Sequence, residues 1–268
     1  MQVIGLCRFS YPALGGFQVD FATLEEKLAY LYAPARMEER FRTFETLTLP
    51  PLRAQTDPDF DFIVVVGDSL PAPYRARLEA LLDDVPQAHL FSFPPKPHRD
   101  IMKRIINKVR RFDGSPCLQF RMDDDDAVAV DFVARLRDVA RKIEPLAQDR
   151  NLIAIDFNRG FVVEPGPDGL HVAETSLPFQ TAALALHVAH DSRQTIMNFA
   201  HNKLPQAMTT ISFTDEDMML RSYNGFNDSR QGPNVNKPEL TLLDAEGEAY
   251  LKARFNIDVG AVRAAYKG

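Results

Sequence analysis

The chain has 268 residues, of which 45% are hydrophobic and 25% are charged, a composition typical of globular proteins and unlike that of disordered ones. A formal net charge of -6 excludes a global positive field, so no nucleic-acid partner is expected and any anionic ligand needs a local group of cations. Two cysteines, Cys7 and Cys117, are too few for a disulfide framework or a zinc site, and both are expected to be reduced core residues.

Short apolar strands alternate with amphipathic helices over the first two thirds of the chain, which predicts a parallel sheet with helices on both faces. The expected strands are residues 3–8, 62–66, 89–93 and 118–122. Helices are expected where apolar residues recur at helical spacing. These residues are Met37, Phe41 and Phe44, then Ile101, Ile105, Val109 and Phe112, and then Phe132, Leu136, Val139 and Ile143.

After residue 144 the alternation gives way to a mixed pattern. Residues 152–157 and 161–164 flank Asn158-Arg159-Gly160, a turn-forming group that predicts a hairpin. Residues 213–221 are acidic at the start and apolar further along, which predicts the first turn of a helix. The segment 227–238 is rich in Asn, Gly and Pro and is expected to be a loop.

The acidic run from Asp123 to Asp126 directly follows a predicted buried strand and precedes a predicted helix. In open α/β sheets, ligands bind at the carboxyl ends of the strands. Carboxylates there can hold Mg²⁺ or Mn²⁺ while substrate phosphates and water complete the metal's shell. The alternative is that the aspartates cap the following helix. Four adjacent aspartates repel one another, so a compensating cation is favoured over a cap.

A family resemblance becomes specific at this run. Met122-Asp123-Asp124-Asp125-Asp126-Ala127-Val128 resembles the segment that carries the DxD motif of GT-A glycosyltransferases. Arg104-Ile105-Ile106-Asn107-Lys108, followed by Gly114, is similar to the helix that leads into this strand in those enzymes. The form Arg-Met-Asp-Asp-Asp-Asp, with Arg8-Phe9-Ser10 after the first strand, resembles a group of bacterial rhamnosyltransferases.

The resemblance covers residues 1–225 in the order and kind of elements, and it implies a fold and a division of the chain. The implied fold is α/β, a nucleotide-diphospho-sugar transferase-like GT-A fold with a Rossmann-like mixed, mostly parallel sheet flanked by helices. One catalytic domain of residues 1–268 is expected. Residues 1–130 would form its nucleotide-sugar-binding half, and residues 131–268 its acceptor half and C-terminal loops.

By this resemblance, Asp123 and Asp125 are the DxD pair. Asp125 would bind Mn²⁺ or Mg²⁺ directly, and Asp123, also a metal candidate, would lie nearer the ribose or sugar of the donor. Asp126 would aid the metal or cap a helix, and Asp124 joins the donor-binding candidates because the run leaves a shift of one residue open. Many GT-A enzymes add a late histidine to the metal, and His201 is the nearest candidate, although a lone histidine is more often structural.

Further donor-binding candidates lie before the acidic run. Residues 96–111 contain seven Lys or Arg and one acidic residue, Asp100, a local cluster that suits a sugar diphosphate. Arg104 and Lys108, one turn apart, are its candidates, while most of the cluster is expected to be a solvated helix face. Arg8 after the first strand and Asp68 after the second are candidates for base or ribose recognition, with a polar turn as the alternative for each.

The candidates for the catalytic base lie late in the chain. Glu216 and Asp217 match the Glu-Asp-x-x-Leu segment of GT-A enzymes, in which the acid faces the acceptor hydroxyl. A carboxylate there would take the acceptor proton in an inverting transfer. Asp217 is the first candidate and Glu216 the second, and the alternative is a capped helix start.

Together these features predict a metal-dependent transfer of a sugar, with rhamnose implied by the narrower resemblance, from a nucleotide-diphosphate donor to a hydroxyl of a glycan or other acceptor. Metal-dependent nucleotidyl transfer is one alternative, since it also uses carboxylate-held metal. The other is a non-catalytic carbohydrate-binding module with a structural cation. The acceptor has no readable code, although the polar residues 224–236 are candidates to contribute to its site.

The N-terminus and the hydropathy pattern bear on location. Residues 1–6 lack the basic region and the long apolar stretch of a signal peptide, and no apolar run reaches the ~18 residues of a membrane span. A cytoplasmic protein without a transmembrane segment is therefore expected, and peripheral attachment at the inner membrane face stays open.

Overall fold

The computed structural model describes residues 1–15, 21–224 and 238–267. Its strands are β1 (Gln2–Arg8), β2 (Asp61–Gly67), β3 (Ala88–Phe93), β4 (Cys117–Asp123), β5 (Asp126–Val128), β6 (Leu152–Gly166), β7 (Gly169–Ser176), β8 (Leu184–Val188), β9 (Thr209–Ser222) and β10 (Thr241–Leu242). Its helices are α1 (Leu24–Leu31), α2 (Pro34–Thr43), α3 (Leu49–Arg53), α4 (Ala72–Leu82), α5 (His98–Val109), α6 (Phe132–Lys142), α7 (Glu144–Ala147), α8 (Leu204–Ala207), α9 (Ala245–Phe255) and α10 (Val259–Tyr266). A π-helical turn, η1 (Phe44–Thr48), joins α2 to α3, and η2 (Ile196–Asn198) and η3 (His201–Lys203) are 3₁₀ turns.

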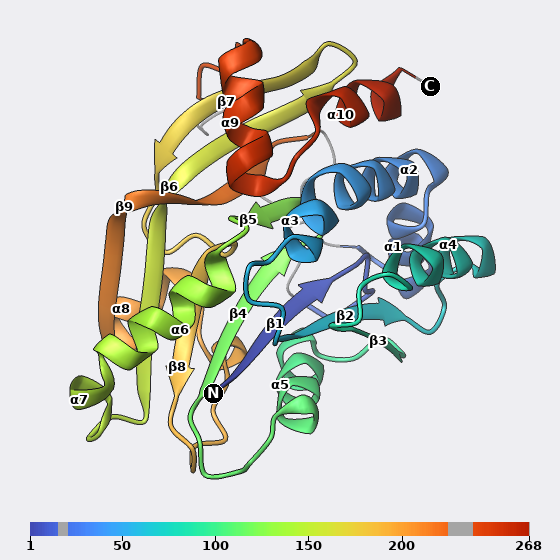
Figure 1. Ribbon diagram of the computed structural model, residues 1–268. Helices are drawn as coiled ribbons and strands as arrows, with labels where there is room; N and C mark the ends of the chain where they lie inside the picture. The colour runs from blue at the N-terminus through green and yellow to red at the C-terminus, as the bar shows by residue number, and fades with distance from the viewer. Residues whose placement is uncertain (16–20, 225–237, 268) are drawn as a thin grey trace.

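All the described strands belong to one sheet, in the order β10-β7-β6-β8-β4-β1-β2-β3, with β9 pairing β6 and β5 (Figure 1). The strands β3, β2, β1 and β4 run parallel, so their carboxyl ends meet at one edge of the sheet. There Arg8 of β1 pairs in register with Asp123 of β4, and Asp68 follows β2. The four predicted strands and the α/β fold with a mixed sheet are confirmed.

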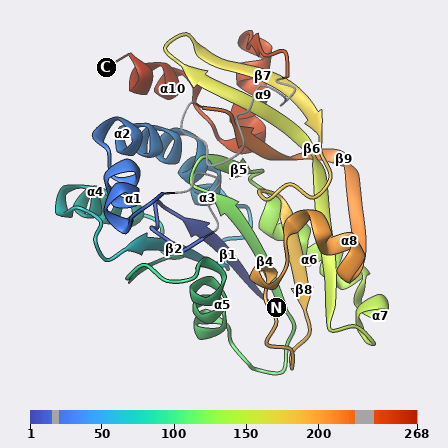
Figure 2. The ribbon, with the colours of Figure 1, turned by 180° about the vertical axis from the view of Figure 1, so that it is seen from behind.

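Helices cover both faces of the sheet with apolar side chains. One face is packed by the helix stretch from α2 to α3 and by α4, α6, α9 and α10, through residues such as Phe41, Phe132 and Phe255. The other face is packed mainly by α5, through Ile101 and Ile105, as Figure 2 shows from behind. The three predicted helices are confirmed, except that α5 ends at Val109 and the half-exposed Phe112 lies beyond it. No helix in the described part of the chain has the length and hydropathy needed to cross a membrane.

Two predictions for the second half of the chain are wrong. Asn158-Arg159-Gly160 is not a hairpin turn but part of the continuous strand β6, where the pairing with β9 shifts register on either side of Arg159. The turn-forming residues mark a β-bulge instead. Residues 213–221 are not the start of a helix but part of β9, which pairs with β6 on one side and β5 on the other. Of the predicted loop 227–238, all but Pro238 lies outside the described residues.

The bulge requires a residue without a side chain at position 160, which is Gly160. A Cβ atom at this position would lie 1.8 Å from the backbone oxygen of Met219 on β9, so a side chain would force the two strands apart. Gly160→Ala is therefore expected to lower the free energy of unfolding by about 1–3 kcal/mol, as overpacking does. Urea denaturation measures this change. Gly166→Ala, where nothing lies within 4 Å of a Cβ, is the matched control, and equal losses in both variants would contradict the prediction.

Candidate functional site

The acidic run forms a tight turn between two strands rather than a helix start. Asp123 is the last residue of β4 and is exposed, whereas Asp126 begins β5. Asp124, Asp125 and Asp126 are each only 3% exposed. The next helix, α6, has Asp131 at its N-cap position. The helix-cap interpretation, including a cap by Asp126, is therefore wrong, because β5 separates the run from the helix.

A buried arginine and an amide hold the turn. The guanidinium Nη1 of Arg40, from α2, lies 2.6 Å from Oδ1 of Asp124 and 3.1 Å from Oδ2 of Asp125, and Arg40 is 2% exposed. The side chain of Asn224 donates to the same Oδ2 of Asp125 at 3.1 Å. The hydroxyl of Thr48 donates to the backbone oxygen of Asp126 at 2.9 Å. The turn is thus bound from α2, from η1 and from the residues that follow β9.

Burial opposes full ionisation of the run. Burial raises the pKa of Asp125 to about 7, with Asp124 and Asp123 adding to the rise and Arg40 opposing it. Burial and the charge of Asp125 raise the pKa of Asp126 well above its ordinary value. Crowded carboxylates in a low-dielectric environment cannot all be charged at low cost. The exposed carboxylate of Asp123 is the one that faces solvent.

Cations surround this edge of the sheet, close to the start of α5. Burial lowers the pKa of His98, the first residue of α5, to about 3. Four neighbouring cations contribute to this fall: Arg8, Arg121, Arg99 and Lys27. They come from β1, β4, α5 and α1, so the fold assembles a cationic cluster that the sequence scatters over more than one hundred residues. We call these four cations, which lie around His98, the cationic cluster.

Arg121 lies at the centre of the cationic cluster. Burial and the charges of Arg99 and Arg8 lower its pKa to about 10, and the charge of Asp123 opposes the fall. Its Nη1 lies 3.6 Å from the sulfur of Met197, and its buried Nε has no hydrogen-bond partner among the described residues. A buried, incompletely bonded guanidinium beside other cations favours an anionic ligand.

The structure brings His201 to the same place. Its Nδ1 lies 2.6 Å from the backbone oxygen of Phe179, and because a carbonyl oxygen only accepts, Nδ1 carries the proton and Nε2 keeps its lone pair. Burial lowers the pKa of His201, as do the charges of Arg121 and Arg221, whereas Asp123 raises it. His201 is thus a neutral imidazole near Asp123. Histidines that bind metals through Nε2 commonly donate a hydrogen bond of this kind from Nδ1.

Asp68 lies at the same edge of the sheet, two strands from Asp123. Its backbone N–H donates to Phe93 at 3.0 Å, and its side chain is exposed. The charge of Asp68 contributes to the raised pKa of both Tyr11 and Tyr32, after burial. Asp68 is therefore an exposed carboxylate near two tyrosines, of which Tyr11 is fully buried and Tyr32 is half-buried.

Arg104 and Lys108 are not brought to the acidic turn. Both are exposed on α5, six and ten residues beyond His98, which places them about 9 and 15 Å along the helix axis. The Nζ of Lys108 lies 5.2 Å from the ring centroid of Phe91 on β3. The part of α5 that lies at the site is its N-terminal end, with His98 and Arg99. Most of the cations in segment 96–111 form a solvated face, as the sequence predicts.

Asp217 and Glu216 are also not brought to the acidic turn. Asp217 is paired with Nε of Arg159 at 2.9 Å and accepts from the hydroxyl of Tyr250 at 2.5 Å. It lines a separate 660 Å³ cavity between β6, β7 and α9. Arg221 on β9 pairs with Asp126 of the acidic turn. Asp217 lies four residues before Arg221 on the same strand, which places it about 13 Å away along β9.

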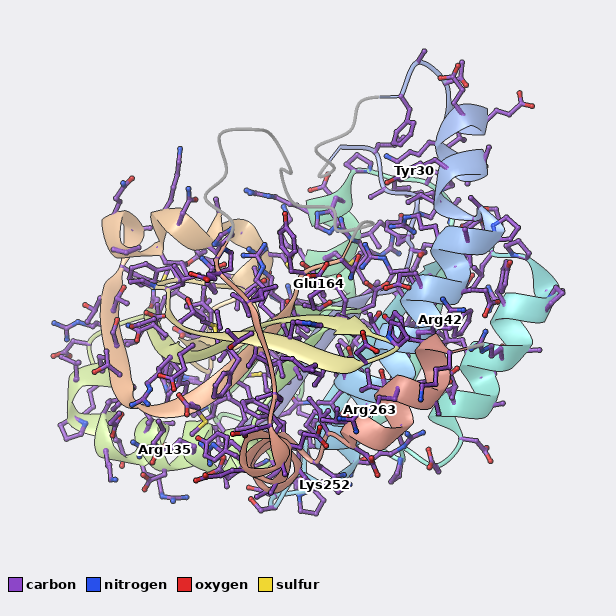
Figure 3. The ribbon with its side chains drawn as sticks, turned by 90° about the horizontal axis from the view of Figure 1, so that it is seen from above. Tyr30, Arg42, Arg135, Glu164, Lys252 and Arg263 are labelled. Atoms are coloured by element: carbon purple, nitrogen blue, oxygen red, sulfur yellow. The ribbon has the colours of Figure 1, made fainter. Side chains whose placement is uncertain are left out.

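Glu216 pairs with Nε of Arg135 on α6 at 3.2 Å. Figure 3 shows Arg135 on the opposite side of the molecule from Tyr30. Tyr30 in turn lies by Arg36, on the helix that holds the acidic turn, with the guanidinium carbon 5.4 Å from its ring centroid. Both base candidates, which rest on the resemblance to the Glu-Asp-x-x-Leu segment, lie on β9 and are bound to other side chains there.

The side chains of this site can hold a divalent cation only together with ligands from a substrate. No group of three or more His, Cys, Asp or Glu side chains is preassembled for a metal among the described residues. Mg²⁺ and Mn²⁺ are commonly held by one or two carboxylates while substrate phosphates and water supply the rest. Asp123, with Asp125 and the Nε2 of His201 nearby, offers donors of that kind. The site therefore suits a cation brought with a diphosphate rather than one held by the protein alone.

Sequence reasoning missed the arginines of α2. Arg36 and Arg40 lie one turn apart and are 1% and 2% exposed, and Arg36 donates to Oγ of Ser10, just after β1, at 2.9 Å. A possible signal was their place beside the apolar positions Met37 and Phe41, because a charged residue next to a buried stripe is often drawn inward. The partners that make burial tolerable are distant in the sequence.

Comparison with known proteins shows the family to which the chain belongs. Residues 2–235 match the sequence profile of a family described as "Putative rhamnosyl transferase". A search of curated proteins gives no match. Among solved structures, the chain is similar to Staphylococcus aureus TarS 1-349 in complex with UDP-GlcNAc, with 9% identity, 85% of this chain and 60% of that chain covered and a TM-score of 0.45.

A second structure of S. aureus TarS 1-349 matches with 10% identity, 83% and 60% coverage and a TM-score of 0.43. The chain thus spans 60% of the length of these TarS structures. The family profile, in contrast, extends over residues 2–235 and so over most of the chain. The protein therefore belongs to this rhamnosyl transferase family.

Proposed function

We propose that the protein is a GT-A type glycosyltransferase that takes a sugar from a nucleotide-diphosphate donor and transfers it to an acceptor hydroxyl. The observation that carries the proposal is the cationic cluster, two of whose members, Arg8 and Arg121, lie near the exposed carboxylate of Asp123 at the carboxyl ends of β1 and β4. A donor diphosphate needs such a cluster, because the leaving nucleoside diphosphate gains negative charge in the transition state. Membership of the rhamnosyl transferase family supports rhamnose as the sugar.

Each part of the donor has a candidate partner at this edge of the sheet. Asp68, beside Tyr11 and Tyr32, would meet the nucleoside, and Arg8 and Arg121 would bind the diphosphate. The carboxylate of Asp123 would orient the ribose or the sugar. Mn²⁺ or Mg²⁺, when bound with the diphosphate, would neutralise phosphate charge. Asp123 and His201 are the residues that would hold it, because Arg40 and Asn224 already bind the carboxylate of Asp125.

The stereochemistry of the transfer and the class of acceptor complete the proposal. Inversion at the anomeric carbon stays a prediction, and it no longer has Asp217 as its base, because Arg159 and Tyr250 hold that carboxylate in the separate cavity. The one-bond carbon–proton NMR coupling at the anomeric carbon of the product, compared with that of the donor, would decide the stereochemistry. The acceptor is proposed only as a hydroxyl compound such as a glycan. Asn224, from the predicted acceptor segment, contacts Asp125 and so lies by the donor site.

The direct test incubates the protein with a panel of nucleotide sugars, including dTDP-rhamnose, in Mn²⁺, Mg²⁺ or chelator. We expect slow release of nucleoside diphosphate from one donor, fastest for dTDP-rhamnose, and a loss of about a hundredfold in Asp123→Asn, the size of effect seen for transition-state charge contacts. Asp123 is exposed, so this variant is expected to fold normally.

Other outcomes favour other functions. Pyrophosphate release from a nucleoside triphosphate and a sugar phosphate would instead indicate nucleotidyl transfer. Sugar binding without turnover of any donor would indicate a carbohydrate-binding module. Either result would overturn the proposed transfer.

A further inference from the structure

Two of the four aspartates of the turn, Asp124 and Asp125, contact a buried protein cation, Arg40. The Nη1 of Arg40 contacts Asp124 at 2.6 Å and Asp125 at 3.1 Å, and side-chain exposure at the three residues is 2%, 5% and 4%. Ion pairs so well excluded from water are screened little by salt, and their loss leaves uncompensated buried charge. The compensating cation that an acidic run requires is therefore already built into the chain.

The helical stretch that carries Arg40 contacts the acidic turn at two points. The helix stretch from α2 widens into the π-helical turn η1 directly after Thr43. π-helical turns are rare and occur often at functional sites. Through this stretch Arg40 reaches Asp124 and Asp125, while Thr48 reaches the backbone of Asp126. Two groups eight residues apart thus bind one short turn.

The contacts also divide the run into two parts. Arg40 and Asn224 bind the carboxylates of Asp124 and Asp125 from the protein side. Asp123 faces solvent at the other side of the turn, where its charge acts on Arg121 and His201. Asp123 is therefore the carboxylate in position to meet a ligand first.

We propose that Arg40 is a positioning residue that takes the place of a divalent cation at Asp124 and Asp125, and so keeps the turn closed to a metal that arrives without the donor. With Arg40 present, a metal finds Asp123 as its main carboxylate and needs the phosphates of a nucleotide to complete its shell. Without Arg40, Asp124 and Asp125 lose a buried cationic partner, and their charge is expected to attract a hard cation. The proposal concerns the site of the proposed function, but it can be tested without any sugar donor.

The test measures the binding of Mn²⁺ alone by electron paramagnetic resonance. We expect weak binding in the wild type and binding at least tenfold tighter in Arg40→Met. Arg40→Lys keeps a cation at the turn, although an ammonium does not reproduce the guanidinium geometry, so its gain in Mn²⁺ affinity is expected to be smaller than that of Arg40→Met. Arg36→Met is the matched control, since Arg36 is equally buried one turn earlier but donates to Ser10 and Leu31. It is expected to leave Mn²⁺ binding unchanged.

A second variant assigns the gain to the turn. Adding Asp125→Asn to Arg40→Met is expected to return Mn²⁺ affinity to near the wild-type value, because one of the released carboxylates is gone. Unchanged or weaker Mn²⁺ binding in Arg40→Met, or an equal gain in Arg36→Met, would overturn the proposal. If Arg40→Met is unfolded, circular dichroism during Mn²⁺ titration decides, since recovery of the fold supports the proposal and its absence contradicts it. Failure of sugar transfer in the wild type would leave these outcomes untouched.

Discussion

Arg121→Met is expected to weaken the binding of a nucleoside diphosphate and to lower kcat/KM for the nucleotide sugar by about a hundredfold. Loss of one preorganised charge contact to a developing anion typically costs this much. Arg121 lies where the charges of Arg8 and Arg99 meet, and these like charges with burial lower its pKa to about 10. It is still charged at neutral pH. An anionic ligand relieves the repulsion among the three, so Arg121 contributes more when a diphosphate is bound.

The matched control for this prediction is Arg104→Met. Arg104 is an exposed cation of the same net charge that lies on α5, away from the acidic turn. Its loss is expected to change diphosphate affinity less than twofold, as solvated surface charges do. Isothermal titration calorimetry with dTDP or UDP measures both variants. Equal losses in Arg104→Met and Arg121→Met would show that the overall charge, rather than the cationic cluster, attracts the donor.

The parallel half of the fold was predictable because each strand is a short buried run. Residues 62–66, for example, are apolar throughout and fully buried, and they lie in β2, which pairs with β1 on one side and β3 on the other. The carboxyl ends of such strands share one edge, so the sequence alone located Arg8, Asp68 and Asp123 at the site. Local composition carries this information because the parallel strands are buried on both faces.

The misreading of β9 has a physical cause. Asp215, Glu216 and Asp217 before Met218 and Met219 have the charge pattern of a capped helix, and that pattern is local. The strand forms because β5 and β6 flank it on both sides, which is a property of the tertiary structure. The local pattern supported only the capped-helix alternative for these residues, whereas the candidate base rested on the resemblance to GT-A enzymes.

The burial of Arg36 and Arg40 could not be predicted from the local sequence either. The segment that contains them also has Glu38 and Glu39, so it looks like a solvated helix face. Their partners are Ser10 after β1 and the turn after β4, which are 26 and 84 residues away. Only the assembled edge of the sheet shows which arginines turn inward.

The second large effect is expected in the pH dependence of stability. His98 is predominantly neutral in the folded protein, because burial and the charges of the cationic cluster lower its pKa to about 3. In the unfolded chain its pKa returns to about 6.5. Between these two values the unfolded state binds more protons than the folded state, so stability rises with pH. The contribution of His98 is therefore complete above about pH 6.5 and is lost progressively as the pH falls towards 3.

The size of this effect follows from one pKa unit being about 1.4 kcal/mol. Between pH 6.5 and pH 5 the loss from His98 is expected to be about 1–2 kcal/mol, after allowance for its partial exposure. His98→Gln is expected to flatten the curve of unfolding free energy against pH by that amount, measured by urea denaturation at each pH. His190→Gln, with an exposed ring, is the control and is expected to keep the wild-type slope.

The same charges make His98 a reporter of the donor site. A bound diphosphate offsets the repulsion from Arg8, Arg121, Arg99 and Lys27, so it is expected to raise the pKa of His98 and to cause proton uptake on binding. Calorimetry in two buffers of different ionisation enthalpy would detect that uptake near pH 5, and His98→Gln would reduce it. A diphosphate that binds without changing the protonation of His98 would mean that it lies away from the cationic cluster, and the placement of the donor at this edge of the sheet would then be wrong.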